Sequence, residues 1–277
     1  MAAKLFSACF GRKGCRKDSS DNAAKVHTAN AQDPASGEEQ RKGGSVLVEL
    51  FTSQGCATSP EAELLISRLG RGELPDDAPP VIILAYHVEY WDYLGWKDPF
   101  GSMLWTARQK AYVEALQQDT IYTPQVVVQG RAECFGTNEE ALLAEISKAQ
   151  QFSGPTMQAT FERKTPETLQ VSLSGALRTK VDGKGMDIMV ALYENGLVTE
   201  VSSGENKGQV MKNDFVVRVL EKMCTVRDVS AKKTVSGTVN FNLWDGFDSS
   251  KCGIVVFLQN PSMQNFGCQQ FQLPDDL

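Results

Sequence analysis

The first part of the chain alternates between short apolar runs and segments with helical spacing. Residues 46–51 (VLVELF) form an apolar run, interrupted only by Glu49, and residues 81–86 (VIILAY) are apolar throughout. Both patterns are typical of strands buried on both faces of a parallel sheet. Between them, apolar positions recur at helical spacing over residues 58–69, with Pro60 in the first turn and Gly70 at the end. This order predicts a right-handed strand–helix–strand unit.

A second set of elements follows the same logic. Residues 104–115 carry an Ala-rich face at helical spacing, and residues 122–130 (YTPQVVVQG) place a proline directly before a strand. Residues 132–135 can pair with that strand as a hairpin, and Asn138 is a suitable cap for a last helix. The resulting order, β-α-β-α-β-β-α, is the minimal pattern of a thioredoxin-like domain.

The texture changes after residue 154, where short segments of alternating apolar residues are separated by Gly, Asn and Pro turns. Such a pattern predicts a β-sandwich. The predicted fold class is therefore an α/β thioredoxin-like domain followed by an all-β sandwich domain. The predicted boundaries are a disordered tail over residues 1–43, the thioredoxin-like domain over 44–153 and the sandwich over 154–277.

The tail lacks periodicity and is too polar to bury a core. Its first 17 residues combine five basic side chains and no acid with Cys9 and Cys15. This pattern permits acylation and weak attachment to an anionic membrane, although a solvated basic tail is the simpler interpretation. Ala2 occupies the place where N-myristoylation requires glycine.

Composition narrows the function classes. A net charge of −6 and a pI near 5.1 argue against a nucleic-acid partner, which would need a basic face. No apolar run approaches the roughly 20 residues of a transmembrane segment, and the first residues lack the apolar core of a secretory signal. Seven cysteines without regular pair spacing are typical of reduced thiols, so we expect a cytoplasmic protein. With two histidines and no close cysteine pair, no metal site is predicted.

The chemistry concentrates at Cys56, at the start of the first predicted helix. Unpaired backbone N–H groups and the helix dipole stabilise a thiolate there, while Glu61 and Glu63 oppose it, so we expect a modestly lowered pKa. Ser59 stands where a Cys-x-x-Cys pair would have its second cysteine, and a hydroxyl cannot resolve a mixed disulfide. Cys134 is a candidate resolving thiol, although a buried inert cysteine is the default interpretation.

Three further residues are expected at the same sheet edge as Cys56. His87 follows the second buried strand, and Thr123 and Pro124 precede the third, which is expected to run antiparallel. His87 is predicted either to carry a proton for the thiol or to be a structural histidine. A cis Pro124 would expose the backbone of Thr123 to an extended peptide or to glutathione.

The segment over residues 86–100 (YHVEYWDYLGWKDPF) mixes aromatic and charged side chains. That mixture predicts one wall of a substrate-binding groove, with Tyr90, Trp91 and Trp96 as contacts. Ordinary packing of a loop against the sheet is the alternative for part of these aromatic residues.

Several motifs together resemble a known family. FTSQGC at 51–56, the aromatic segment at 86–100 and YTPQVVVQGR at 122–131 are similar to the thioredoxin-like family catalogued as domain of unknown function 1223, found in bacteria and plants. SGENKG at 203–208 and NDFVVR at 213–218 look like that family's second-domain signatures. Members commonly carry Cys-x-x-Cys-Pro where this chain has CATSP, so the resemblance transfers the first cysteine and not the second. The family's substrate is undefined, and a fold does not settle chemistry.

Two functions from different classes follow. The first is a thiol redox protein in which Cys56 is the sole nucleophile, with no bound cofactor. It either exchanges disulfides with protein thiols or glutathione or captures a partner as a mixed disulfide. The second is a redox-inactive thioredoxin-like module that binds a protein partner through the aromatic segment and the sandwich. A third hypothesis, that the GENKG loop at 204–208 binds a ligand or ion, has weaker support because no loop shows the spaced acids of a calcium site.

Overall fold

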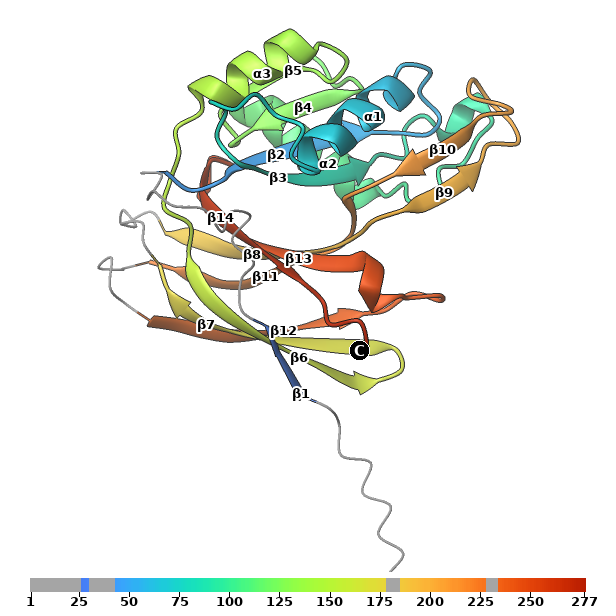
Figure 1. Ribbon diagram of the computed structural model, residues 1–277. Coiled ribbons are helices and arrows are strands. Elements are labelled where there is room, and N and C mark those ends of the chain that lie inside the picture. Colours follow the sequence, from blue (N-terminus) through green and yellow to red (C-terminus); the bar gives the residue numbers. More distant parts are fainter. Residues whose placement is uncertain (1–25, 30–42, 178–184, 228–233) are drawn as a thin grey trace, which may run out of the picture.

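The computed structural model describes residues 26–29, 43–177, 185–227 and 234–277 (Figure 1). Cys9, Cys15 and the rest of the basic N-terminal segment lie outside the described residues, so the predictions for that segment have no structural counterpart here. Within the range predicted to be a tail, residues Val26–Ala29 form strand β1.

The central element is an eight-stranded mixed sheet with the strand order β14-β13-β8-β11-β3-β2-β4-β5. In chain order, these strands are β2 (Val46–Thr52), β3 (Val81–His87), β4 (Gln125–Val128), β5 (Ala132–Phe135), β8 (Met186–Glu194), β11 (Val216–Val226), β13 (Cys252–Gln259) and β14 (Asn265–Gln272). The strands β2 and β3 are parallel, as their apolar runs predict, and β11 joins β3 in parallel on its other side. One sheet therefore contains strands from both halves of the chain.

Two smaller sheets complete the β-structure. An antiparallel sheet has the order β1-β6-β7-β12, in which β6 is Thr156–Thr165, β7 is Thr168–Ala176 and β12 is Thr234–Asn242. The strands β9 (Leu197–Glu200) and β10 (Val210–Asn213) pair only with each other and form a hairpin that projects beside the first helix (Figure 1).

Three α-helices of the described chain gather around the β2–β5 end of the large sheet (Figure 1). They are α1 (Ser59–Gly70), α2 (Met103–Ala115) and α3 (Glu139–Lys148), and short 3₁₀ turns occupy η1 (Asp92–Leu94) and η2 (Ser249–Lys251). Ser102 and Asn138 cap α2 and α3 by accepting backbone N–H groups at 3.2 and 3.0 Å. None of the helices in the described part of the chain has the length and apolar character of a membrane span.

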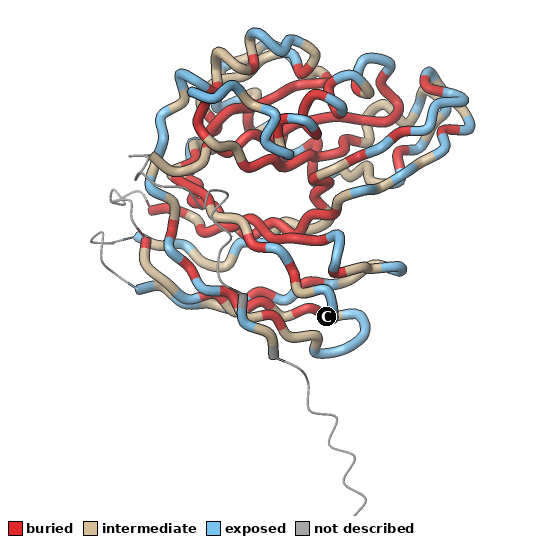
Figure 2. Tube along the Cα trace, viewed as in Figure 1, coloured by how far each residue is buried: buried red, intermediate tan, exposed pale blue. Residues whose placement is uncertain are grey.

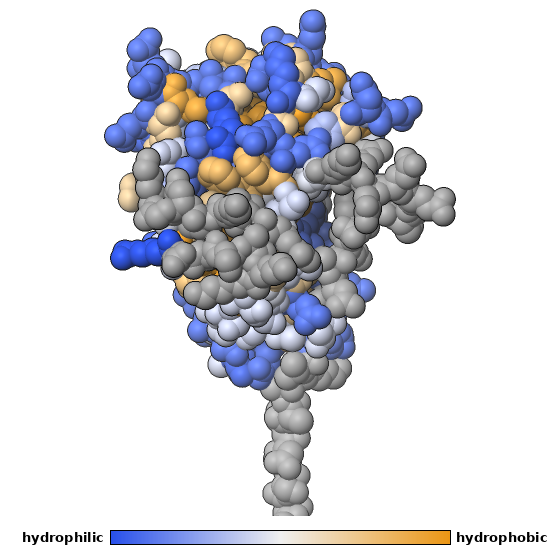
Figure 3. Space-filling view, turned by 90° about the vertical axis from the view of Figure 1, so that its left-hand side faces the viewer, coloured by the Kyte–Doolittle hydropathy of each residue, from blue (hydrophilic) through white to orange (hydrophobic). Residues whose placement is uncertain are grey.

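The large sheet separates two apolar cores, which appear as buried layers in Figure 2. Strand β13 shows the separation most clearly because it is buried along its whole length. Val255 and Phe257 belong to the core under the helices, whereas Ile254 and Val256 belong to the core shared with β6, β7 and β12. Successive side chains of a strand point to opposite faces, so each strand of this region contributes to both cores. Hydrophilic side chains predominate on the side of the molecule seen in Figure 3, with apolar patches between them.

The predicted fold class, an α/β thioredoxin-like domain followed by an all-β sandwich, is wrong. Of the described residues, 43% lie in strands and 18% in helices, which makes the protein mostly β, and its large mixed sheet runs through both predicted domains. The prediction failed because it assigned the strands of the two halves of the chain to separate domains. The N–H of Ala85 in β3 instead donates to the carbonyl of Phe215 at 2.8 Å, and β11 continues the sheet.

A buried ion pair connects the helical side of this sheet with its far edge. The Arg108 guanidinium lies 2.6 Å from the Glu49 carboxylate, with side-chain exposures of 7% and 0%. Arg108 also donates to Gln259 of β13 at 3.2 Å, and Asn265 of β14 donates to Glu49 at 3.4 Å. The hydroxyl of Tyr112 donates to the same carboxylate. The pair therefore joins α2 and β2 to the two last strands.

We expect Glu49→Gln to destabilise the protein by about 3–5 kcal/mol, because it leaves the buried Arg108 charge without its carboxylate. Glu73→Gln is the matched control, since Glu73 pairs with Arg68 at 3.3 Å while 57% exposed and should contribute less than about 1 kcal/mol. Urea unfolding of both variants measures the difference. Equal losses in the two variants would contradict a structural role for the buried pair.

Candidate functional site

Cys56 lies in the short loop between the end of β2 and the start of α1. Its N–H donates to the Ser53 carbonyl at 3.1 Å, and its own carbonyl accepts the N–H of Ser59 at 3.3 Å. The loop therefore passes directly into the first turn of the helix, as the sequence predicts. Cys56 is only 6% exposed, so access to its sulfur is narrow.

Hydrogen-bonding groups surround the sulfur. Cys56 Sγ lies 3.4 Å from Thr58 Oγ1 and 3.6 Å from the carbonyl oxygen of Thr123. Burial alone would raise the pKa of the Cys56 thiol, but hydrogen bonds from the side chains of Ser59, Thr123 and Thr58, and from the Thr58 N–H, outweigh it and lower the pKa. Neutral donors, which favour the charged form, therefore stabilise the thiolate.

The aromatic segment contacts this environment through Thr123, which precedes Pro124 with a cis peptide bond. Trp91 Nε1 donates to Thr123 Oγ1 at 2.6 Å. Because that hydroxyl oxygen accepts from Trp91, its own hydrogen is free to point at Cys56. The ring of Trp91 also stacks on Tyr93, which is 77% exposed, at a centroid distance of 6.3 Å.

Tyr90 lies in the same neighbourhood. Its hydroxyl donates to Gln109 Oε1 at 3.3 Å, and its ring is 5.7 Å from that of Trp91. Burial, together with the negative charges of Cys56 and Glu89, raises the pKa of Tyr90. Tyr90 is thus a neutral hydroxyl beside the thiol.

The pKa values of the other described cysteines are shifted in the opposite direction from that of Cys56. Burial raises the pKa of Cys134 to about 11 and the pKa values of Cys252 and Cys268 to about 12. The pKa of Cys224 is raised for the same reason. Among the cysteines in the described ranges, Cys56 is the one whose pKa is lowered.

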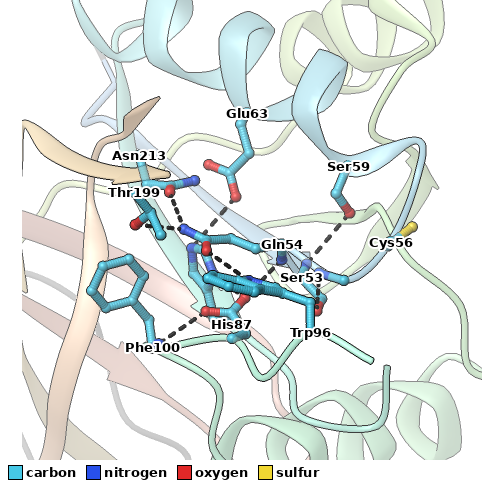
Figure 4. Close-up of polar contacts among 12 residues, drawn as sticks. Ser53, Gln54, Cys56, Ser59, Glu63, His87, Trp96, Phe100, Thr199 and Asn213 are labelled. Atoms are coloured by element: carbon cyan, nitrogen blue, oxygen red, sulfur yellow. Dashed lines mark hydrogen bonds and ion pairs between the residues drawn. The ribbon is translucent and has the colours of Figure 1, made fainter. Parts of the chain in front are cut away.

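His87 belongs to a separate buried cluster. Its Nδ1 lies 2.8 Å from Asp98 Oδ2 and its Nε2 lies 3.4 Å from Glu63 Oε1, and all three side chains are almost completely buried. Burial lowers the pKa of His87, but the two carboxyl groups outweigh that effect and raise it. In Figure 4 the sulfur of Cys56 points away from this cluster. Both ring nitrogens of His87 thus face carboxyl groups instead of the thiol.

The cluster reaches the Cys56 loop through Gln54. The N–H of Gln54 donates to Asp98 Oδ2 at 2.7 Å, and Gln54 Oε1 accepts from Trp96 Nε1 at 3.1 Å (Figure 4). Gln54 Nε2 donates to Asn213 Oδ1 at 2.8 Å and to Thr199 Oγ1 at 3.1 Å, both on the β9–β10 hairpin. Trp96 therefore supports the loop beside the polar cluster, whereas Trp91 and Tyr90 lie beside Thr123.

Asn206, in the connection between β9 and β10, also contacts the loop. Its Nδ2 donates to the carbonyls of Gln54 and Cys56, each at 2.9 Å, and the residue is 2% exposed. Asn206 is not among the residues predicted for the site, although it lies inside the SGENKG segment that carries the family resemblance. A separation of 150 residues gives no periodic signal, so only that motif could have suggested it.

The fold and site define a mostly β protein with one thiol in a hydrogen-bonded loop. Residues 47–259 match the family described as "Protein of unknown function (DUF1223)", so the chain belongs to that family. The resemblance to the family is thereby confirmed. No curated protein sequence matches the chain.

Two solved structures have a similar fold. The chain is similar to protein AGR_C_4864 from Agrobacterium tumefaciens, with 24% identity, a TM-score of 0.59, and coverage of 87% of this chain and 98% of that chain. It is also similar to HBP35 of Porphyromonas gingivalis, with 14% identity, a TM-score of 0.58, and coverage of 83% and 76%, respectively. At these identities the likeness concerns the fold alone.

The raised pKa of His87 predicts a pH-dependent contribution to stability. The contribution is fully present below the unfolded-state pKa of about 6.5 and is lost as pH rises through the higher folded-state pKa. We therefore expect the stability difference between wild type and His87→Gln to be largest below about pH 6.5 and to shrink at higher pH. Urea unfolding across this pH range measures it.

An NMR titration provides an independent check. The chain has two histidines, so in a His27→Gln background the imidazole signals belong to His87 alone. Titration of that imidazole at or below about pH 6.5 would contradict the buried carboxyl pairing.

Proposed function

We propose that this protein carries out thiol–disulfide exchange with Cys56 as its single nucleophile. The observation that supports the proposal is the contrast between Cys56, whose pKa is lowered despite burial, and the other described cysteines, whose pKa values burial raises. The thiolate is the nucleophile in such exchange, and a perturbed pKa maintained by specific partners is typical of a functional site.

In the first step, the Cys56 thiolate attacks one sulfur of a disulfide. An S–S bond forms to Cys56 while the original S–S bond breaks, and the other sulfur leaves as a thiolate that takes a proton from water. Ser59 then cannot complete the cycle, because its hydroxyl does not displace a thiolate from the mixed disulfide. A second thiol, from glutathione or from a protein, attacks the mixed disulfide and releases Cys56.

The surroundings of Cys56 leave a substrate only a narrow path to the sulfur, and aromatic side chains lie beside that path. The sulfur lies beside the carbonyl of Thr123, with Trp91 and Tyr90 on the same side and the exposed Tyr93 stacked on Trp91. Of Cys56 itself only 6% is exposed, so the incoming disulfide must reach it from an extended or small molecule. A disulfide on an extended protein segment and glutathione disulfide both meet that condition.

The pH dependence of Cys56 alkylation tests the reactive thiol. In the full-length protein, we expect iodoacetamide to modify Cys56 with an apparent pKa below the free-thiol value of about 8.5, and Cys134 to react only at higher pH. Mass spectrometry of peptides assigns each site. Incubation with glutathione disulfide is expected to give a mixed disulfide at Cys56 that is absent in Cys56→Ser.

A gain-of-thiol variant tests the single-thiol cycle. Ser59→Cys supplies the missing second sulfur, so the mixed disulfide should disappear as an internal bond to Cys56 forms and glutathione is released. If the apparent pKa of Cys56 alkylation is about 8.5 or higher and no mixed disulfide with glutathione forms at Cys56, the proposal is wrong. A redox-inactive module that binds a protein partner through the aromatic segment would then be the remaining interpretation.

A further inference from the structure

The connection between β9 and β10 packs against the Cys56 loop at several points. Besides the two hydrogen bonds of Asn206, the hydroxyl of Ser203 donates to the carbonyl of Gly95 at 2.6 Å. Gly204 lies against Trp96, where a Cβ would come within 3.0 Å of the Trp96 Cβ, and its φ of +74° also favours glycine. This connection is therefore fitted to the loop and the aromatic segment.

The side chain of Asn206 is itself fixed in orientation. Its Oδ1 accepts from Gln209 Nε2 at 3.2 Å, which leaves both Nδ2 hydrogens for the carbonyls of Gln54 and Cys56. The backbone of the connection is braced as well, since the N–H of Gln209 donates to the Asn206 carbonyl at 3.1 Å. The amide therefore presents its two donors from a preorganised position.

The two carbonyls and the sulfur of this loop have different partners. The carbonyls of Gln54 and Cys56 meet Asn206, whereas the sulfur meets Thr58 and the carbonyl of Thr123. The Cys56 carbonyl also accepts the first N–H of α1, from Ser59. A shift of this carbonyl would therefore move the sulfur relative to the donors at the start of the helix.

We propose that Asn206 is a positioning residue for Cys56: its amide fixes the backbone at residues 54–56 and so keeps the sulfur within reach of the donors of Thr58 and Ser59. The second half of the chain thereby determines the reactivity of a thiol in the first half. The inference deepens the proposed function, because it concerns the same thiol, but its test measures the thiol without requiring exchange.

The test compares the apparent pKa of Cys56, from alkylation rates against pH, in four full-length variants. Asn206→Ala removes both donors, and Asn206→Asp replaces them with a carboxylate, so both should raise the pKa of Cys56, the second more strongly. A rise of one pKa unit lowers the thiolate fraction at pH 7 by up to about tenfold, and the alkylation rate falls with it. Gln209→Leu, which frees the Asn206 amide, should give a smaller rise, and Ser202→Ala, an exposed neighbour, should give none.

A lowered melting temperature with an unchanged pKa of Cys56 in Asn206→Ala would mean that Asn206 is merely structural and would overturn the inference. If Asn206→Ala fails to show a cooperative unfolding transition, Gln209→Leu decides: a raised pKa supports the inference and an unchanged pKa overturns it. A wild-type Cys56 with a low, Asn206-dependent pKa but no mixed disulfide would support the inference while refuting the proposed exchange.

Discussion

Ala85 in β3 donates its N–H to the carbonyl of Phe215, and at the next residue, Val216, β11 begins alongside β3. This pairing removes an exposed sheet edge, which is otherwise a site for unwanted association. It also determines where the β9–β10 hairpin lies, because the hairpin immediately precedes β11 in the chain. The hairpin is therefore placed at the carboxyl end of β3, beside the loop that carries Cys56.

Two buried charge clusters stabilise this arrangement in different ways. Glu49 and Arg108 lie in the core and connect β2 and α2 with the last two strands. Removing charges from water is costly, so such a pair contributes mainly when its remaining hydrogen bonds are satisfied, and Tyr112, Gln259 and Asn265 satisfy them here.

The His87 cluster acts on the candidate site indirectly. Asp98 accepts hydrogen bonds from both His87 and the N–H of Gln54. The carboxylate that pairs with His87 therefore also holds the backbone of the Cys56 loop at Gln54. The side-chain amide of Gln54 accepts a hydrogen bond from Trp96 and donates one to Asn213 of the β9–β10 hairpin. Neutral donors stabilise the Cys56 thiolate, which explains how a cysteine with so little exposure has a lowered pKa.

The sequence alone determined much of the local structure. The apolar runs at 46–51 and 81–86 form β2 and β3, and Cys56 lies at the start of α1, because buried parallel strands and helix starts depend on neighbouring residues. Thr123 lies beside Cys56, as the order of the strands predicts, and Trp91 of the aromatic segment contacts Thr123. His87, which the same strand order places at that edge, faces two carboxyl groups instead of the thiol.

Only the tertiary structure decided which strands pair across the chain. The pairing of β3 with β11, the position of His87 between two carboxyl groups and the contact of Asn206 with the Cys56 loop all join residues that are far apart in sequence or lie on different elements. Alternation and helical spacing report which face of an element is buried, but they carry no information about its partner. For that reason the sequence located the thiol, and the packing of the second half against it decided what surrounds that thiol.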